Sequence, residues 1–421
     1  MIRVVELFSG IGSQATAIRK VCSKRKEKCK VLNTCEWDIH AIVAYDYIHN
    51  GFHLNKDVLN MSRNELLEQL SQFNLSGDGK VPLSNRTLNT YSDDYLIKVL
   101  SSVKNTNNLI NIKDLKGEQL PADITIMTYS FPCQDLSNVG ALHGYNKGID
   151  RNANTRSGLL WEVERLLLER NDKGLDLPKF LLLENVTTLE ASRHKANFEE
   201  WQNRLTKLGY INIVYKLYAP DFGIPQNRRR LLMLSVYVGS DDKFKEKVLL
   251  YKKNHNLENK EYLDSLNIKK KALSDFLKLD YTNKVYFNEA ILSQPNNTPS
   301  RNTIWNKNSI IYSEEGKLNK IVQTITTKQD RHPNSGNLYF DYENNKKAKY
   351  RFLTPRECFL LMGFDEKDFD VLINNNFYTR RGSLFFSRDK LYKLAGNSIV
   401  VNMLEGIFNQ VLDLIEISKS N

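Results

Sequence analysis

The Pro132–Cys133 pair is the position in this sequence with the clearest capacity for nucleophilic chemistry. The largely apolar run from Ile124 to Tyr129 precedes it and is typical of a buried parallel strand. Because the proline would end that strand, Cys133 is predicted at its carboxyl end, where open α/β sheets bind ligands. A thiol placed there can act as a nucleophile. The alternative is a small buried cysteine without a chemical role, and these residues alone leave both interpretations open.

A carboxylate and two arginines occupy similar positions at two further predicted strands. Glu184 lies near the end of the apolar run 180–186, where burial would raise its pKa, as in general acids. The alternative is a structural carboxylate that caps the following turn. Arg228 and Arg230 precede the apolar run 231–237 and, two positions apart on a strand, would face the same side. Guanidinium forks there suit a carboxylate or a phosphate, and the alternative is a set of surface arginines on an edge strand.

The first 60 residues have the pattern of a nucleotide-binding βαβ unit. The pattern predicts a strand over 4–8, a glycine turn over 9–12, a helix over 14–22, a strand over 31–35 and a third strand tip at 56–58. Glycines in the turn allow the backbone to approach a ligand closely. Glu36, at the tip of the second strand, suits hydrogen bonds with two ribose hydroxyls. Dehydrogenases share such a loop, so the kind of nucleotide cofactor stays open at this point.

The rest of the chain predicts an α/β protein with a second, less regular domain. A polar, weakly periodic stretch is interpreted as a helical insertion beside the sheet, and a Lys-, Asn-, Tyr- and Thr-rich stretch as loops and small strands. These stretches are residues 61–118 and 240–349, and apolar spacing predicts helices over 158–170 and 197–208. Helices return at Thr354, which begins a capping-box pattern with Pro355 and Glu357, and continue to about Leu414.

The charge of the chain favours a polyanionic partner. Its 421 residues include 60 Lys and Arg against 49 Asp and Glu, a net charge of +11. The alternative is compositional, because a Lys- and Asn-rich chain carries many solvated lysines. No apolar run approaches about 18 residues, and the chain enters a strand pattern at its first residues, so neither a membrane span nor a signal peptide is expected. The five cysteines have no metal-like spacing, which indicates a cytoplasmic protein without a metal site.

Seven short segments, in order along the chain, together resemble the DNA (cytosine-5-)-methyltransferases of bacterial restriction–modification systems. They are Glu-Leu-Phe-Ser-Gly-Ile-Gly (6–12), Glu-Trp (36–37), Ser-Phe-Pro-Cys-Gln-Asp-Leu-Ser (130–137), Leu-Leu-Glu-Asn-Val (182–186), Gln-Asn-Arg-Arg-Arg (226–230), Arg-Phe-Leu-Thr-Pro-Arg-Glu-Cys (351–358) and Ala-Gly-Asn-Ser-Ile-Val (395–400). One departure is Ser157, which separates Arg156 from Gly158 where the family has an Arg-Gly pair. The resemblance implies a Rossmann-like S-adenosylmethionine-dependent methyltransferase domain with a smaller, irregular α+β target-recognition domain.

The resemblance also implies a division of labour along the chain. Residues 1–239 would form the catalytic domain, with 61–118 as an insertion. Residues 240–349 would form the target-recognition domain, and 350–421 would return to the catalytic domain. The implied reaction transfers a methyl group from S-adenosylmethionine to carbon 5 of a flipped-out cytosine in a short, specific double-stranded DNA sequence, and leaves S-adenosylhomocysteine.

The catalytic roles implied by the resemblance involve four residues. The Cys133 thiolate would add to carbon 6 of the cytosine, which makes carbon 5 nucleophilic and leaves a covalent adduct. Glu184 would hydrogen bond or protonate ring nitrogen 3. Arg228 and Arg230 would contact the base, its phosphate and the Glu184 region.

The resemblance assigns further residues to binding. Cofactor contacts would come from Phe8, Ser9, Gly10, Ile11, Gly12, Glu36, Trp37, Asp57, Val58, Pro132, Asn397 and Ser398. DNA contacts would come from Gln134, Ser137, Gly140, Arg156, Thr324 and Ile325, with Arg301, Lys328, Gln329 and Arg331 as candidate readers of base edges. The expected partners are double-stranded DNA and a separately acting cognate restriction endonuclease; the protein is expected to be a monomer that binds no membrane.

Three other kinds of protein are compared with this interpretation. An RNA methylase of the same fold would carry Pro-Pro-Cys and Cys-Phe-Thr, and neither tripeptide occurs. A catalytically inactive DNA-binding relative is disfavoured because all the chemical positions are intact. Amino-methylases need an (Asp/Asn/Ser)-Pro-Pro-(Tyr/Phe) sequence, which is also absent. The recognition sequence itself cannot be read from residues 240–349.

Overall fold

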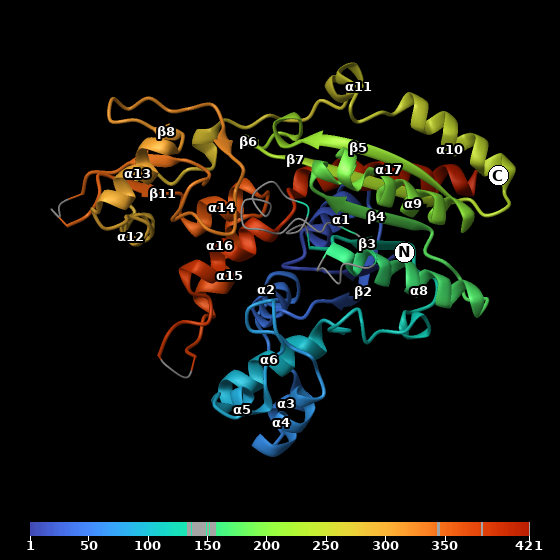
Figure 1. Ribbon diagram of the computed structural model, residues 1–421, viewed down its shortest axis with the longest axis horizontal. Helices are drawn as coiled ribbons and strands as arrows, with labels where there is room; N and C mark the ends of the chain where they lie inside the picture. The colour runs from blue at the N-terminus through green and yellow to red at the C-terminus, as the bar shows by residue number, and fades with distance from the viewer. Residues whose placement is uncertain are drawn as a thin grey trace. The chain divides into compact units, whose positions relative to one another are not determined.

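The computed structural model describes residues 1–132, 136, 149, 151, 157–342, 346–379 and 382–420. Backbone contacts divide the chain into two compact units (Figure 1). The large unit comprises Met1–Leu217, Arg229–Asn267 and Leu404–Asn421, and the small unit comprises Tyr218–Arg228 and Ile268–Met403. These divisions do not coincide with the expected boundaries at 240 and 350, because residues 240–267 pack with the large unit and 350–403 with the small one.

The large unit is built on a six-stranded sheet with the strand order β2-β1-β3-β4-β7-β5. Its strands are β1 (Ile2–Leu7), β2 (Cys29–Cys35), β3 (Ile126–Tyr129), β4 (Phe180–Asn185), β5 (Tyr210–Tyr218) and β7 (Arg229–Tyr237). The pairs β1–β2, β1–β3 and β3–β4 are parallel, whereas β7 pairs antiparallel with β4. The predicted strands at 4–8, 31–35, 124–129, 180–186 and 231–237 are therefore confirmed.

Helices cover both faces of this sheet (Figure 1). The helices of the large unit are α1 (Ser13–Lys24), α2 (Ile39–Asn50), α3 (Lys56–Leu59), α4 (Arg63–Ser71), α5 (Asn85–Leu88), α6 (Asp93–Asn105), α8 (Leu160–Asp172), α9 (Ser192–Lys207), α10 (Asp242–Asn254), α11 (Lys260–Ser265) and α17 (Val401–Lys419), with short 3₁₀ turns at Gly117–Gln119, Ser157–Leu159 and Thr187–Glu190. Side chains alternate between the faces of a strand. Leu7, Tyr129 and Leu183 thus join one core with Leu166 of α8 and Trp201 of α9. On the opposite face, Glu6 bonds to α1 and α2.

The topology brings the predicted site segments to one edge of the sheet. Parallel strands end at the same edge, so the residues that follow β1, β2, β3 and β4 lie there together. Strand β7 runs the other way and begins at that edge, as the pairing of Asn185 with Leu231 shows. Chain segments separated by more than 200 residues in sequence thereby reach one place.

The insertion at 61–118 is helical, as predicted. Its helices α4, α5 and α6 begin at the N-caps Ser62, Ser84 and Ser92, whose hydroxyl oxygens each accept a backbone N–H of the first turn. Helix α6 packs against α2 and buries Leu96, Val99 and Leu100.

The small unit combines short strands with helices. Its strands are β6 (Gln226–Asn227), β8 (Ile310–Tyr312), β9 (Val322–Gln323), β10 (Asn337–Tyr339) and β11 (Tyr350–Phe352), and its helices are α12 (Lys284–Leu292), α13 (Pro299–Lys307), α14 (Pro355–Leu361), α15 (Glu366–Asn374) and α16 (Arg388–Asn397), with 3₁₀ turns at Ala219–Phe222 and Leu273–Asp275. Strands β11, β10 and β8 form one sheet, and β6 pairs with β9. Residues 240–349 hold more helix than predicted, because Asp241, Asn259, Asn283 and Thr298 act as N-caps.

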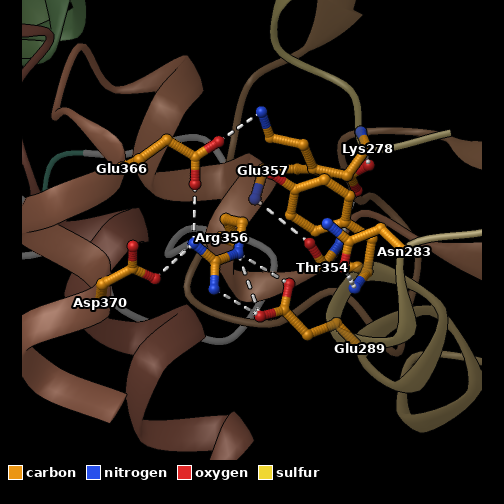
Figure 2. Close-up of polar contacts among 9 residues, drawn as sticks. Lys278, Asn283, Glu289, Thr354, Arg356, Glu357, Glu366 and Asp370 are labelled. Atoms are coloured by element: carbon orange, nitrogen blue, oxygen red, sulfur yellow. Dashed lines mark hydrogen bonds and ion pairs between the residues drawn. The ribbon is translucent and has the colours of Figure 1, made fainter. Parts of the chain in front are cut away.

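Helix α14 begins as the sequence predicts, with Thr354 as N-cap and a reciprocal bond between Thr354 and Glu357. Glu357 also forms a fully buried ion pair with Arg351, with N–O distances of 2.8 and 2.9 Å. Beside it, the Arg356 guanidinium contacts the carboxylates of Glu289, Glu366 and Asp370, as Figure 2 shows. A motif that carries family resemblance therefore forms an ion-pair network within the small unit.

One stretch of the described chain, Arg388–Lys419, is long and apolar enough to cross a membrane by length and composition alone. Of its most apolar window, 67% is buried inside the protein. Such burial is typical of a core helix.

Candidate active site

The glycine loop after β1 has a backbone conformation that few residues tolerate. Phe8, Gly10 and Gly12 have φ values of +56°, +55° and +80°, in the left-handed region. A Cβ at Gly12 would lie 2.1 Å from Nε2 of His49, whereas a Cβ at Gly10 would have no neighbour within 4 Å. Glycine at position 12 is thus required by the side chain beneath the loop, and open space lies over position 10.

Glu36 ties this loop to the end of β2. One carboxylate oxygen accepts the Gly10 N–H at 3.1 Å, and the other accepts the N–H groups of Trp37 and Asp38, each at 2.9 Å. Burial raises the pKa of the Glu36 carboxyl, and the three backbone N–H bonds oppose that rise. The structure therefore brings together three predicted cofactor elements: the glycine loop, the Glu36 carboxylate and the backbone N–H of Trp37.

The loop has the properties that a nucleotide-like cofactor with hydroxyl and amino-acid groups requires. Among the residues that the structure describes, the buried Ser9 Oγ has no hydrogen-bond partner. A buried hydroxyl of this kind is normally satisfied, so a bound ligand is a natural partner. Together with the open space over Gly10 and the Glu36 carboxylate, it fits the predicted S-adenosylmethionine.

Three residues beneath the loop were given no role from the sequence. Glu6, inside β1, accepts the Ala15 N–H at 2.9 Å and the Tyr45 hydroxyl. Burial raises the pKa of Glu6 to about 7, against the opposing effects of Tyr45, Arg19 and Ala15. His49 bonds to Ile11 O at 3.0 Å, and burial lowers its pKa to about 3. The sequence signal that could have revealed Glu6 is a carboxylate inside an otherwise apolar predicted strand.

The capping geometry explains why Glu6 lies there. Helix α1 begins after Gly12, which has no side chain to accept the first N–H groups of the helix. Glu6 supplies the missing acceptor from the neighbouring strand by bonding to Ala15, the third helical residue. The loop can therefore keep a glycine next to the ligand and still begin a stable helix.

The predicted third strand tip at Lys56–Val58 is wrong. These residues form the one-turn helix α3, because the Asn55 side chain accepts the Asp57 N–H and caps it. Asp57 is exposed, and Val58 is fully buried where α3 packs against α6. The cofactor role of Asp57 and Val58 stays a prediction.

A second group of predicted residues meets at the ends of β3 and β4. The Asn185 side chain donates to Phe131 O at 3.1 Å, next to Pro132, and accepts the Val186 N–H at 2.9 Å. Asn185 thus binds the backbone of the segment that precedes Cys133. Glu184 is 9% exposed and lies 3.1 Å from Nε of Arg230. The antiparallel start of β7 places Arg230 beside this carboxylate.

Five predicted residues of this region lie outside the residues that the structure describes. They are Cys133, Gln134, Ser137, Gly140 and Arg156. Of the neighbouring residues that are described, Leu136 accepts the Thr188 hydroxyl at 2.6 Å through its carbonyl, and Trp161 donates to Ile149 O at 2.9 Å.

The small unit gathers the other predicted residues. Arg228 is 2% exposed and donates to the carbonyl oxygens of Ile325 at 3.0 Å and Ser398 at 2.8 Å. Of the two predicted catalytic arginines, Arg230 thus contacts Glu184, whereas Arg228 donates to these two backbone oxygens. Thr324 donates to Asn227 O, and Asn397 is exposed at the end of α16.

One candidate reader of base edges is wrong. Gln329 is 1% exposed, donates to Thr326 O at 3.2 Å and accepts the Ser335 N–H at 3.2 Å. Its side chain therefore holds the loop together. Arg301 forms an ion pair with Asp330, and Lys328 is exposed.

Comparison with known proteins agrees with this arrangement. The C-5 cytosine-specific DNA methylase family matches residues 83–413. The orphan methyltransferase M.SssI of Spiroplasma monobiae is 34% identical over 417 residues, covering 97% of each chain. The type II methyltransferase M2.ScrFI of Lactococcus lactis subsp. cremoris is 29% identical over 419 residues, covering 98% of this chain and 99% of its own.

Two solved structures share the fold. The Schizosaccharomyces pombe Dnmt2 methyltransferase superposes with a TM-score of 0.57 at 18% identity, covering 98% of this chain and 99% of its own. The Entamoeba histolytica methyltransferase EhMeth gives a TM-score of 0.54 at 17% identity, covering 98% of both chains. With the family match over most of the chain, the protein belongs to the C-5 cytosine-specific DNA methylases, the S-adenosylmethionine-dependent enzymes that methylate carbon 5 of cytosine in DNA.

Proposed function

We propose that Cys133 is the nucleophile of this methyltransferase and that Glu184 and Arg230 act on the same cytosine. The observation that carries the proposal is the Glu184–Arg230 pair, 3.1 Å apart at the sheet edge where Asn185 bonds to Phe131, two residues before Cys133. Two groups that can act on a base thus lie beside the segment that carries the thiol.

The chemistry proceeds in three balanced steps. The Cys133 thiolate forms a bond to carbon 6, and the displaced electron pair makes carbon 5 nucleophilic. S-adenosylmethionine, when bound, would supply the methyl group to carbon 5, and its sulfur would keep the electron pair of the broken sulfur–methyl bond as S-adenosylhomocysteine. A base then removes the carbon-5 proton, the thiolate leaves carbon 6 with its electron pair, and a proton given to nitrogen 3 returns to Glu184, which restores the aromatic ring and the free thiolate.

Glu184 assists the first step at ring nitrogen 3. A proton or strong hydrogen bond from its carboxyl to this nitrogen accepts the charge that develops as the thiolate adds. Arg230 holds the carboxyl through Nε and donates from Nη1 to Arg229 O at 2.7 Å. Its side chain is therefore fixed at two points, which favours a constant geometry during the reaction.

The cofactor and DNA assignments are supported by the geometry of the glycine loop at residues 8–12 and by the motifs that this chain shares with the family. Residues 8–12, Glu36 and Trp37 would hold the adenosine and amino-acid parts of the cofactor, together with Asp57, Val58, Pro132, Asn397 and Ser398. A target base must leave the duplex to reach the thiol. Gln134, Ser137, Gly140, Arg156, Thr324 and Ile325 would contact the DNA around it, and residues 240–349 would read the sequence as a target-recognition domain.

We further propose a monomer that modifies double-stranded DNA in the bacterial cytoplasm. The two relatives compared above are bacterial proteins, one named an orphan methyltransferase and the other a type II methyltransferase. The net charge of +11 supports a polyanionic substrate. If the protein functions like its type II relatives, it acts beside a separate cognate endonuclease. If it functions like the orphan relatives, it acts without one.

The test is transfer of labelled methyl groups from S-adenosylmethionine to plasmid DNA, read by bisulfite sequencing. We expect modified cytosines in one short context, no transfer by Cys133→Ser, and turnover about 10²–10⁴-fold lower for Glu184→Gln, with DNA binding kept. Matched controls are Cys29→Ser, a half-buried thiol in β2, and Glu199→Gln on α9.

The outcomes separate the alternatives. Substantial turnover by Cys133→Ser would remove the nucleophile assignment. Transfer to tRNA but not to DNA would favour the RNA methylase interpretation, and bound DNA without any transfer would favour an inactive relative.

A further inference from the structure

The segment Gln-Thr-Ile-Thr-Thr, residues 323–327, is fixed in the small unit by the Gln226–Arg228 motif. The two-residue strands β6 and β9 pair in parallel, Gln226 with Val322 and Asn227 with Gln323. Two residue pairs alone hold the segment weakly, and side-chain hydrogen bonds add to this backbone pairing. The Gln226 side-chain oxygen accepts the Ile325 N–H at 3.0 Å, and the Arg228 guanidinium donates to Ile325 O at 3.0 Å. Both backbone polar groups of Ile325 are therefore bonded by this one motif.

The same guanidinium binds a second segment. Nη2 of Arg228 donates to Ser398 O at 2.8 Å and to Gly396 O at 3.4 Å, at the end of helix α16. The side chain is 2% exposed, so it makes these bonds inside the unit. A planar fork reaches two carbonyl groups at once, which a single ammonium group cannot reproduce. Arg228 thus bridges residues 323–327 and 396–398.

Gly396 shows that the two segments also touch directly. A Cβ at this position would lie 2.5 Å from the carbonyl carbon of Thr326 and 2.5 Å from the amide nitrogen of Thr327. Backbone therefore packs against backbone, and no larger residue fits without displacing one segment. A shift of either segment must be transmitted to the other, because close-packed interiors do not absorb such displacements.

We propose that Arg228 is a positioning residue that couples the binding of DNA to the binding of the cofactor. The proposal rests on the proposed function, in which Thr324 and Ile325 contact DNA and Asn397 and Ser398 contact the cofactor. Each ligand then acts on one of the two segments that the Arg228 guanidinium joins. In this proposal Arg228 does not contact the reacting base. Arg230, beside Glu184, makes that contact.

Coupling of this kind is reciprocal and measurable. If DNA raises the affinity for the cofactor by some factor, the cofactor must raise the affinity for DNA by the same factor. Typical coupling changes affinity by roughly 5–150-fold. A lysine at position 228 can bond to one segment or the other but not bridge both, so it should remove most of that factor while each ligand still binds alone.

The experiment measures the Kd of S-adenosylhomocysteine on the full-length protein with and without a DNA duplex that contains the modified context. We expect wild-type protein to bind about 10-fold more tightly with DNA. Arg228→Lys should change by less than about 2-fold. Gln226→Met, which loses the acceptor for Ile325 N, is a second variant in case Arg228→Lys does not fold. Arg229→Lys is the matched control, because Arg229 is the exposed neighbour and should keep the wild-type ratio.

The failure of this inference differs from the failure of the proposed function. If wild-type protein transfers methyl groups but DNA leaves the Kd unchanged, or if Arg228→Lys and Gln226→Met keep the wild-type ratio, the coupling role is wrong and the proposed function stands. If wild-type protein binds both ligands and transfers no methyl group, the proposed function fails and this inference fails with it.

Discussion

Among the residues that the structure describes, two glutamates are completely buried, and their surroundings give them opposite properties. Glu6 lies in β1 of the large unit beneath the cofactor loop, and Glu357 lies in the first turn of α14 in the small unit; both are 0% exposed. Glu6 accepts hydrogen bonds from the Tyr45 hydroxyl and the Ala15 N–H. Burial dominates over these two bonds and raises the pKa of Glu6 to about 7.

Glu357 is instead clamped by a cation and by backbone N–H groups. Arg351 bonds to both carboxylate oxygens at 2.8 and 2.9 Å, and the Thr354 and Lys278 N–H groups each donate at 2.8 Å. The pKa of Arg351 is raised although burial alone would lower it, because Glu357 lies against it. Figure 2 shows Glu357 beside the Arg356 network.

The comparison teaches that burial alone does not decide whether a carboxyl is an ion. Glu357 has a bidentate arginine six positions earlier in the chain, and the pair is held as two charges. Glu6 accepts hydrogen bonds from two neutral donors, the Ala15 N–H and the Tyr45 hydroxyl, which lie 9 and 39 positions away in the chain. Near neutral pH, Glu6 is partly protonated because its pKa is about 7, whereas Glu357 forms an ion pair with Arg351.

The largest expected effect is from breaking the Arg351–Glu357 pair. Glu357→Gln leaves the Arg351 guanidinium buried without its counter-charge, which should destabilise the protein by about 3–5 kcal/mol. The measurement is urea-induced unfolding of wild type and variant at pH 7.

A double variant checks that the loss comes from the stranded charge. Arg351→Met with Glu357→Gln removes both charges and should be less destabilised than the sum of the two single variants. Glu366→Gln, which removes a half-buried partner of Arg356, is the milder control. A loss below about 1 kcal/mol for Glu357→Gln would show that the pair does not operate as a charged unit.

The sequence was sufficient to predict what depends on neighbouring residues. The capping box at Thr354, the glycine turn after β1 and the buried strands each follow from local patterns, and all three are present. The Glu184–Arg230 contact followed from the family resemblance, because nothing local to either residue indicates an antiparallel β7 beside β4.

The sequence was insufficient where a side chain's partner comes from a distant segment. Arg228 bonds to carbonyls 97 and 170 positions away, and no spacing rule connects them. Gln329 was a candidate base reader by residue type, yet its loop folds back and buries it. The strand tip at 56–58 failed because Asn55 caps a helical turn there, which overrides the apolar signal of Val58.

The second prediction concerns Glu6→Gln and depends on pH. The folded protein holds the Glu6 proton up to about pH 7, whereas the unfolded chain releases it near pH 4.5. Between these values the native state binds more protons, so the free energy of unfolding falls as pH rises. The substitution removes this pH dependence. When the pH is raised from 5 to 8, the free energy of unfolding of Glu6→Gln should therefore increase by about 2–3 kcal/mol relative to that of wild type.

The measurement is the difference in unfolding free energy between Glu6→Gln and wild type at the two pH values. Comparing differences cancels any pH-independent loss from the substitution. Burial lowers the pKa of His49 to about 3, so His49 takes up a proton on unfolding at the lower pH in both proteins, and this contribution cancels in the difference between them. A difference that stays constant between pH 5 and pH 8 would show that Glu6 titrates as an ordinary carboxyl.

The smallest expected effect is from Tyr45→Phe, which deletes the hydroxyl that donates to Glu6. This bond lowers the pKa of Glu6, so it stabilises the ionised carboxylate more than the acid. The variant should therefore lose about 1–2 kcal/mol at pH 8, where Glu6 is ionised, and less at pH 5. In the Glu6→Gln background the same substitution should have no pH dependence, because no titrating group remains for the hydroxyl to favour. Equal losses at both pH values in the wild-type background would mean that Tyr45 stabilises α2 by packing, and that the cofactor loop is held without any contribution from the charge of Glu6.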